Sequence, residues 1–242
     1  MEIDYSNRKG WAERYIRRKN NGKIGWADED SYKSKEIRIN NFLVRNPLPK
    51  NSRFLELGCG AGNITLLMAK KGFESHGVDI VPEAIQWAQE KMAISNTTAD
   101  FKTGNIVDMN CYSDNYFDFI FDGETLHCII DSDRKGCLAG IFRIIKQGGY
   151  FLAGANLSNT TLTTPVRLDE NCYFDPKTRC LYHDNVPYYY LSEEQEFLSE
   201  IQEAGFKIKY FEKTPSIPEY APIHAGWLWV DAVKPENKIL TA

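Results

Sequence analysis

A glycine-rich turn directly after an apolar segment constrains this chain more than any other feature. Residues 54–63 (FLELGCGAGN) predict a buried strand that enters a sharp turn and then a helix. Gly58, Gly60 and Gly62 have no side chain, so the backbone there can turn tightly or approach a ligand closely. Glu56, near the end of the predicted strand, can accept hydrogen bonds from an amine or a hydroxyl. The arrangement indicates a binding site for a nucleoside cofactor.

The spacing of these glycines separates two kinds of cofactor. Dinucleotide-binding folds use G-x-G-x-x-G, which places a pyrophosphate at the N-terminus of the helix. This chain has E-x-G-x-G-x-G, with an acid ahead of the first glycine. A carboxylate repels a pyrophosphate and attracts a cationic aminoacyl group. The pattern therefore favours an aminoacyl nucleoside over NAD.

The segment closely resembles motif I of the class I S-adenosylmethionine (SAM) methyltransferases, and the resemblance continues downstream. Residues 74–79 predict a second strand that ends in an acid, Asp79, where doubly wound folds place a carboxylate on the ribose hydroxyls. Residues 101–106 stand where the family has Gly-Asp near the adenine, with Asn105 in place of the acid. Residues 117–122 and 143–151 match the fourth strand and the turn into the fifth.

The resemblance implies a fold, a cofactor and a site. The expected fold is α/β and Rossmann-like, a doubly wound, mostly parallel seven-stranded sheet with an antiparallel C-terminal edge, and strands separated by helical patterns agree with it. The expected cofactor is SAM, with S-adenosylhomocysteine as product. The cofactor-binding residues implied are Trp11, Trp26, Glu56, Gly58, Cys59, Gly60, Gly62, Asp79, Ile80, Asn105, Ile106 and Asp122.

Composition places the chain among ordinary globular proteins, with 43% hydrophobic and 26% charged residues. No apolar run approaches the ~20 residues of a membrane helix, and residues 1–4 lack the design of a signal peptide. The six cysteines include no C-x-x-C pair and fit reduced thiols. Only Cys172 and Cys180 could face each other across a hairpin. We therefore expect a cytoplasmic protein with no metal and no membrane partner.

The predicted organisation is one methyltransferase domain over residues 1–242. Residues 1–45 form an N-terminal helical cap, and residues 46–156 form the SAM-binding core. Residues 157–190 form an insertion that covers the substrate. Residues 191–242 form a C-terminal helix followed by a pair of strands, and a capping box at residues 192–195 begins the helix. Whether the chain is a monomer or a dimer stays open.

Two additions to the core are rich in aromatic residues. In the N-terminal segment, Trp11, Tyr15 and Trp26 either anchor the chain by packing or form a lid over the cofactor sulfonium. The pattern W-x-x-R-Y followed by G-K-I-G-W is similar to the opening of the thiopurine methyltransferase family, which acts on soft nucleophiles. The insertion carries six Tyr and Phe residues, which argues against disorder and favours a substrate cover.

Methyl transfer from SAM requires alignment and exclusion of water, and a thiolate needs little else. An ammonium or an alcohol must first lose a proton. The candidate catalytic base is His127, which lies beyond the fourth predicted strand. His127 lies in an apolar stretch, so it can equally be structural. Asp122 and Glu124 could bind the aminoacyl group or a cationic substrate, or cap the loop. We favour a site role for Asp122 because it ends a strand at the cofactor face.

A net charge of −4 argues against a nucleic-acid substrate. The exception is a basic run near the N-terminus, which is usual for a solvated helix face; its members are Arg8, Lys9, Arg14, Arg17, Arg18, Lys19 and Lys23. The predicted function is SAM-dependent methyl transfer to a small molecule, with a thiol preferred and an amine or hydroxyl next. The alternatives are an NAD-dependent oxidoreductase and a SAM-binding module without catalysis.

Overall fold

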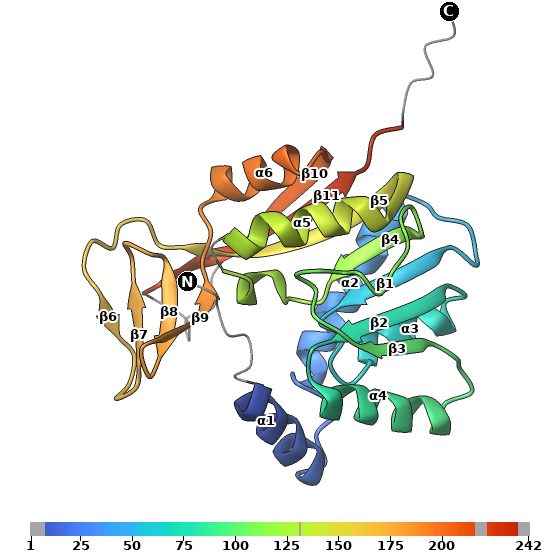
Figure 1. Ribbon diagram of the computed structural model, residues 1–242, viewed down its shortest axis with the longest axis horizontal. Coiled ribbons are helices and arrows are strands. Elements are labelled where there is room, and N and C mark those ends of the chain that lie inside the picture. The colour runs from blue at the N-terminus through green and yellow to red at the C-terminus, as the bar shows by residue number, and fades with distance from the viewer. Residues whose placement is uncertain (1–7, 131, 216–221, 237–242) are drawn as a thin grey trace, which may run out of the picture.

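The computed structural model describes residues 8–130, 132–215 and 222–236, and a seven-stranded sheet forms its centre (Figure 1). In spatial order the strands are β3 (Asp100–Thr103), β2 (Glu74–Asp79), β1 (Arg53–Leu57), β4 (Phe117–Asp122), β5 (Ile145–Ser158), β11 (His224–Val233) and β10 (Lys207–Thr214). The first five run parallel, and β11 is antiparallel to both β5 and β10. The predicted sheet with its antiparallel C-terminal edge is confirmed.

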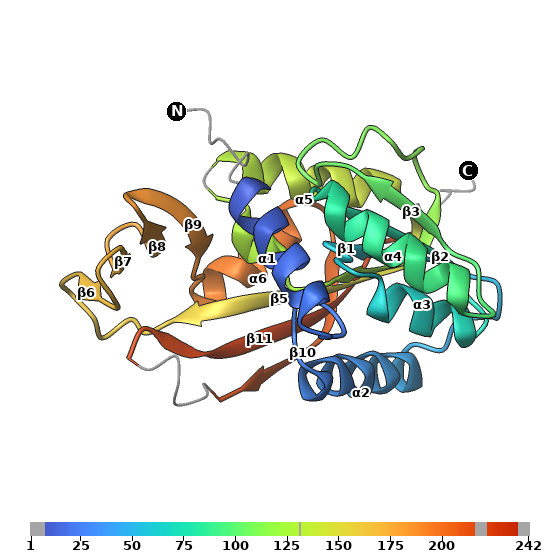
Figure 2. The same cartoon turned by 90° about the horizontal axis from the view of Figure 1, so that it is seen from below.

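Helices cover both faces of the sheet, which is why its central strands are apolar along nearly their whole length. The helices α2 (Glu29–Arg45) and α3 (Asn63–Lys70) pack on one face, and α5 (Ser132–Ile144) and α6 (Glu194–Glu203) pack on the other. Figure 2 shows α2 and α5 on opposite sides of the strands. Beside β3 lies α4 (Pro82–Ile94), and α1 (Arg8–Asn20) packs against α4.

The strand order reverses beside β1, which lies between β2 and β4. Leu57 at the end of β1 pairs with Val78 of β2 and with Asp122 of β4. The turns that follow these three strands therefore lie side by side at one edge of the sheet. Open α/β sheets bind ligands at this kind of switch point.

The first of these turns depends on its glycines. Gly58, Gly60 and Gly62 have φ angles of +64°, +51° and +73°, a region that L side chains rarely adopt. A Cβ atom on Gly60 would lie 2.7 Å from the Tyr15 hydroxyl. The turn thus has the geometry that the sequence spacing predicts. The N-terminal segment packs against this turn through Tyr15.

The insertion folds as a second sheet beside the first (Figure 1). Its antiparallel strands are β6 (Val166–Arg167), β7 (Cys172–Asp175), β8 (Cys180–His183) and β9 (Val186–Tyr190). The hairpin pairs Cys172 with His183 and Cys180 with Asp175, so the two cysteines are not opposite each other. No disulfide joins the six cysteines, all of which lie in described ranges.

One helix boundary differs from the prediction. The capping box was expected at residues 192–195, but Glu193 is the N-cap of α6. The backbone N–H of Glu193 donates to Oε2 of Glu196 at 3.3 Å. A carboxylate at the N-cap can accept backbone hydrogen bonds as a hydroxyl does, which allows the helix to start one residue later.

Across the described ranges, no helix combines the length and the apolar character needed to cross a membrane.

Candidate functional site

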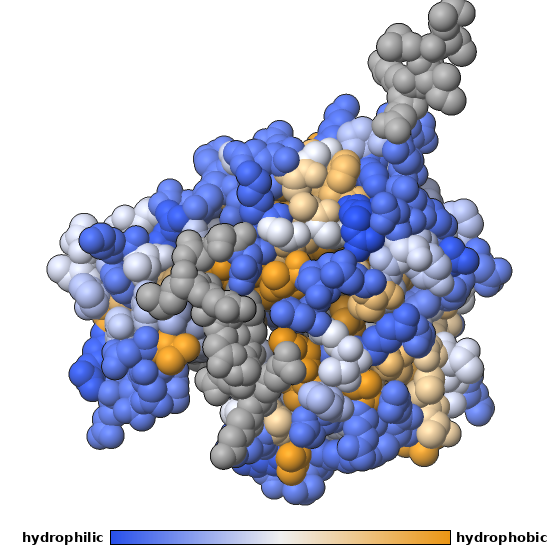
Figure 3. Space-filling model, viewed as in Figure 1, coloured by the Kyte–Doolittle hydropathy of each residue, from blue (hydrophilic) through white to orange (hydrophobic). Residues whose placement is uncertain are grey.

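A cavity of about 370 Å³ opens at the carboxyl ends of the parallel strands. Figure 3 shows hydrophobic side chains gathered near the middle of the face that it draws. The predicted site residues that line the cavity are Trp11, Trp26, Glu56, Gly58, Cys59, Gly60, Asp79 and His127. A smaller hollow shares Trp11, Gly58 and Asp79 with it and adds Ile80, Asn105 and Ile106. The structure therefore brings eleven of the thirteen predicted residues to two adjoining hollows.

Asp79 lies at the junction of the two hollows. Its Oδ2 accepts a hydrogen bond from the N–H of Gly60 at 2.8 Å, and its Oδ1 accepts one from the N–H of Val81 at 2.9 Å. Burial raises the pKa of this carboxyl to about 6. The backbone N–H of Ile80 also acts on this carboxylate. Three donors leave at least one of its four lone-pair sites, so Asp79 can also accept a hydrogen bond from a ribose hydroxyl.

Glu56 is the second buried acid of the cavity and lies 3% exposed. Its Oε2 accepts hydrogen bonds from the backbone N–H and the hydroxyl of Thr65, at 2.9 and 2.6 Å. No described residue donates to its Oε1. Burial raises the pKa of Glu56 to about 7, against the influence of Thr65 and Lys35. A cationic or hydrogen-bond-donating ligand would compensate this buried carboxyl.

The buried cation of the cavity is Lys35 of α2, which sequence reasoning missed. Its Nζ lies 3.0 Å from Oε2 of Glu124 and donates to the carbonyl of Gly123 at 3.1 Å. Glu124 itself has a φ of +69°, an unusual conformation that is often found at functional sites. No motif surrounds Lys35, and only the fold carries it to the strand ends.

The smaller hollow, of about 40 Å³, is lined by the residues that the family resemblance assigns to the adenine. Ile80 and Ile106 supply apolar walls, and Asn105 adds a polar one. The side-chain oxygen of Asn105 accepts a hydrogen bond from the N–H of Val107 at 3.0 Å, which fixes the turn after β3. The amide NH₂ group of Asn105 can donate a hydrogen bond to a ligand, which an aspartate carboxylate cannot do.

Two predicted cofactor residues, Gly62 and Asp122, line neither hollow. Gly62 caps α3, and a Cβ there would lie 2.7 Å from the Phe101 ring. Asp122 is fully buried behind the cavity wall. Its Oδ1 accepts hydrogen bonds from Thr125 and Leu126, and its Oδ2 accepts one from Gly154. Asp122 therefore holds the turn after β4, the capping alternative, and does not reach the cofactor space.

That turn, η1 (Leu126–Cys128), carries His127 into the cavity wall. Burial, together with the positive charge of Lys35, lowers the pKa of His127 to about 3, so the imidazole is neutral at pH 7. Its Nδ1 is buried and has no hydrogen-bond partner among the described residues. The ring stands nearly at right angles to Tyr189 at 4.6 Å and to Trp227 at 6.0 Å.

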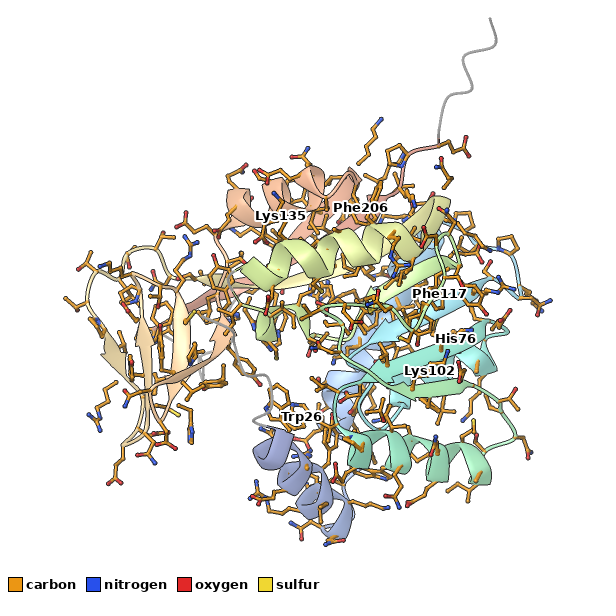
Figure 4. The ribbon with its side chains drawn as sticks, viewed as in Figure 1. Trp26, His76, Lys102, Phe117, Lys135 and Phe206 are labelled. Atoms are coloured by element: carbon orange, nitrogen blue, oxygen red, sulfur yellow. The ribbon has the colours of Figure 1, made fainter. Side chains whose placement is uncertain are left out.

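The N-terminal segment packs directly on the cofactor turn. Tyr15 is buried against Ala61 and Val81, and its ring centroid lies 5.1 Å from that of Trp26. Trp26 lies beside α1, on the side toward the main sheet (Figure 4). The guanidinium of Arg14 lies 3.9 Å from the centroid of the Trp26 ring. These aromatic residues therefore both anchor the segment and line the cavity.

The far wall of the cavity comes from residues that no motif identified. The insertion contributes Leu168, Leu181, Tyr188 and Tyr189, and β11 contributes His224 and Trp227. The only signal in the sequence was the density of aromatic residues in the insertion. Among the described residues, no group of three or more His, Cys, Asp and Glu side chains is placed to hold a metal ion.

Comparison with known proteins places this site in a family. Residues 48–205 match the family described as a methyltransferase domain. An S-adenosyl-L-methionine-dependent Diels-Alderase of Talaromyces variabilis is 32% identical over 107 residues, which cover 43% of this chain and 36% of that protein. A ubiquinone biosynthesis O-methyltransferase of Xanthomonas campestris is 26% identical over 121 residues, covering 50% of this chain and 49% of that protein. The chain thus spans between about a third and a half of these relatives.

Solved structures show the same fold. A SAM-dependent methyltransferase of Methanosarcina mazei superposes with a TM-score of 0.63 at 24% identity, covering 80% of this chain and 98% of that one. A 1,6-didemethyltoxoflavin-N1-methyltransferase of Burkholderia thailandensis superposes with a TM-score of 0.64 at 18% identity, covering 95% and 87%. The narrower resemblance to thiopurine methyltransferases stays a prediction. The matched residues, the strand order and the site together show that this chain belongs to the methyltransferase domain family, as the class I resemblance predicted.

Proposed function

We propose that this chain transfers a methyl group from SAM to a small-molecule acceptor. The observation that carries the proposal is the pair of buried acids at the glycine turn. Glu56 and Asp79 line one cavity at the ends of adjacent strands, and each retains hydrogen-bonding capacity toward a ligand. A cavity of about 370 Å³ lies within the range of roughly 300–1,000 Å³ that is usual for small-molecule sites.

The residues fit the parts of this cofactor. Asp79 would hold the ribose hydroxyls, and Ile80, Asn105 and Ile106 would enclose the adenine. Glu56 would face the cationic aminoacyl group across the turn that begins at Gly58. Bound SAM supplies a methyl group on a sulfonium, which the acceptor attacks in line. A dinucleotide fits less well, because its pyrophosphate would meet the two carboxylates.

The acceptor would enter from the side of His127, beneath the cover formed by the insertion. This chain's contribution to the reaction is then to align the acceptor and to exclude water. Among acceptor atoms, a soft nucleophile such as a thiol is the first candidate, and an amine or a hydroxyl is the next. His127 would contact the acceptor, and its role as a base is the least favoured part of the prediction, because its conjugate acid is disfavoured in this site.

A nucleic-acid acceptor is less favoured. In the basic N-terminal run, Arg18 pairs with Asp28 at 3.0 Å, and Lys19 pairs with Glu90 of α4. Part of the run is therefore used within the chain. No base-flipping motif accompanies it.

Incubation with methyl-labelled SAM and separate pools of small thiols, amines and phenols tests the proposal. We expect label to appear in one pool. Binding of SAM without transfer to any pool would instead favour the SAM-binding module without catalysis, and tighter binding of NAD than of SAM would favour an oxidoreductase. Transfer to a thiol would support the thiopurine-like prediction.

A further inference from the structure

The two ends of the cavity differ in charge. The charged side chains among its lining residues are Lys35, Glu56, Asp79 and Glu124, and all of them lie around the turns that follow β1, β2 and β4. Lys35 is already paired with Glu124. The opposite end is lined by aromatic, aliphatic and neutral polar side chains from η1, the insertion and β11. Lys35 lies near enough to His127 to lower its pKa, but its charge is paired with Glu124. Among the lining residues, a ligand part seated between the insertion and β11 therefore meets no unpaired charge.

The walls of the second end are flat aromatic surfaces with aliphatic residues between them. Tyr189 packs against Tyr188 at 4.5 Å and against His127 at 4.6 Å. Trp227 adds a further aromatic surface. Its ring centroid lies 6.0 Å from the ring centroids of both His127 and His224. Aromatic rings recognise another ring by stacking or by edge-to-face contact and gain more than area burial alone.

The histidines of this end carry no charge. Burial lowers the pKa of both His127 and His224, the former to about 3. A charged acceptor group placed here would lose its hydration without gaining an opposite charge, which is costly.

His127 supplies the polar contact. A buried N–H without a partner is rarer than a buried acceptor without one, so the ring proton belongs on Nε2 and not on the unpartnered Nδ1. Because His127 lines the cavity while its Nδ1 is closed off, Nε2–H is the polar group through which the ring can meet a ligand. His127 then acts as a hydrogen-bond donor, which positions the acceptor molecule.

We infer that the methyl acceptor is an uncharged, planar aromatic molecule that stacks among Tyr188, Tyr189 and Trp227 and accepts a hydrogen bond from His127. The inference rests on the proposed function only in taking this end of the cavity as the acceptor site. It narrows the acceptor without naming its reactive atom: an aromatic thiol, a phenol and a ring nitrogen all satisfy it. Aliphatic thiols and charged amines do not.

Binding of four matched probes tests this inference with S-adenosylhomocysteine present at saturation. The probes are 2-naphthol, 2-naphthoate, 2-naphthylmethylammonium and the saturated alcohol 2-decalinol, each titrated by calorimetry. We expect 2-naphthol to bind at least tenfold more tightly than each of the others. Tighter binding of a charged or saturated probe, or no binding of 2-naphthol, would overturn the inference. Binding of S-adenosylhomocysteine is measured first, so failure of the proposed function is seen separately.

Variants locate the probe within the cavity. Tyr189→Leu and Trp227→Leu should each weaken 2-naphthol binding by about threefold to tenfold, a change of the size expected for losing one aromatic contact. Tyr173→Leu is the matched control, since Tyr173 belongs to the same insertion but stacks on Tyr182 outside the cavity. His127→Leu should weaken binding, and His127→Asn, which keeps a side-chain N–H, should restore much of it. Equal binding by His127→Leu and the unchanged chain would contradict the donor role.

Discussion

The two ends of the cavity are built in different ways. We call the charged end, where we propose that the cofactor binds, the cofactor end, and the aromatic end, where we propose that the acceptor binds, the acceptor end. The cofactor end consists of turns that follow β1, β2 and β4, where backbone N–H groups of Gly60 and Val81 hold the carboxylate of Asp79. The acceptor end consists of side chains from η1, the insertion and β11, which approach one another only through the fold. A site made of backbone geometry tolerates little change, whereas a site made of side chains can be altered one residue at a time. We therefore expect substitutions at the cofactor end to have the larger effects.

The largest effect should come from Gly60→Val. The φ of Gly60 is +51°, and a Cβ there would lie 2.7 Å from the Tyr15 hydroxyl. Valine would therefore strain the turn and displace the aromatic residue that covers it. We expect affinity for S-adenosylhomocysteine to fall by at least about 100-fold, corresponding to roughly 2.7 kcal/mol, as measured by calorimetry.

Gly136→Ala provides the control for Gly60→Val. Gly136 lies in α5, and a Cβ there meets nothing within 4 Å. Alanine in a helix interior is favoured over glycine by roughly 0.5–1 kcal/mol, so this variant should be slightly more stable and bind the nucleoside normally. If both glycine variants bound the nucleoside as the unchanged chain does, the assignment of the cofactor turn would be wrong.

The same contrast explains what sequence could predict. The strand, glycine turn and helix from Phe54 onward depend on neighbouring residues, and so the pattern identified Gly58 and Gly60. The family resemblance then supplied the type of sheet and the acid at Asp79. Lys35 and Trp227 escaped prediction because no motif surrounds either residue, and packing alone brings them to the cavity. Asp122 was assigned to the cofactor because it ends a strand, but whether a carboxylate faces a cavity or caps a turn depends on packing behind the strand.

A smaller effect is expected for Asp79→Asn. The amide keeps one acceptor oxygen and has no charge, so it should weaken a ribose contact by about tenfold or more. Asp79→Ala should also destabilise the free protein, because alanine would leave the buried N–H groups of Gly60 and Val81 without acceptors, at a cost of roughly 1–3 kcal/mol each.

Thermal unfolding and calorimetry on Asp79→Asn and Asp79→Ala separate the two roles. Both variants should lose affinity for the nucleoside. Both should also lower the thermal midpoint, alanine by more, because asparagine still accepts from one of the two N–H groups whereas alanine accepts from neither. Unaltered affinity in both would place the ribose elsewhere.

Several-fold changes in ligand affinity with pH should follow from the ionisation of Glu56. Burial raises the pKa of this carboxyl to about 7. A carboxyl with a raised pKa binds its proton more tightly in the folded chain than in the unfolded one. Its contribution to the free energy of unfolding therefore falls as the pH rises from its ordinary range through about 7. The ammonium of the ligand's amino-acid group favours the ionised form of Glu56, so affinity for S-adenosylhomocysteine should rise over the same interval.

Glu56→Gln should reduce both trends, because glutamine does not ionise. Asp79 contributes in the same direction with its pKa of about 6, so a residual dependence at lower pH is expected in this variant. The measurement is affinity and thermal midpoint between pH 5.5 and 8. An affinity that fell with rising pH in the unchanged chain would argue against a cationic group beside Glu56.

The smallest effect concerns the segment that covers the cofactor end. The loop between α1 and α2 is held by hydrogen bonds to the carbonyls of Ile24 and Gly25, donated by Asn63 at 3.0 Å and by Arg18 at 2.6 Å. The N-terminal segment also packs on the cofactor turn through Tyr15, so a ligand there should stabilise the segment. We expect hydrogen exchange over residues 8–30 to slow by a few-fold on adding S-adenosylhomocysteine.

The matched region for this exchange measurement is α6, which packs on the opposite side of the sheet from α2 and lines neither hollow. Its exchange should be unchanged by the ligand. If residues 8–30 and α6 were equally protected with and without the nucleoside, Trp11, Tyr15 and Trp26 would serve as an anchor alone. Slowing confined to residues 8–30 would instead show that the cofactor end has one movable wall, assembled from side chains as the acceptor end is. Backbone geometry would then fix the cofactor end at the sheet edge but not where the N-terminal segment covers it.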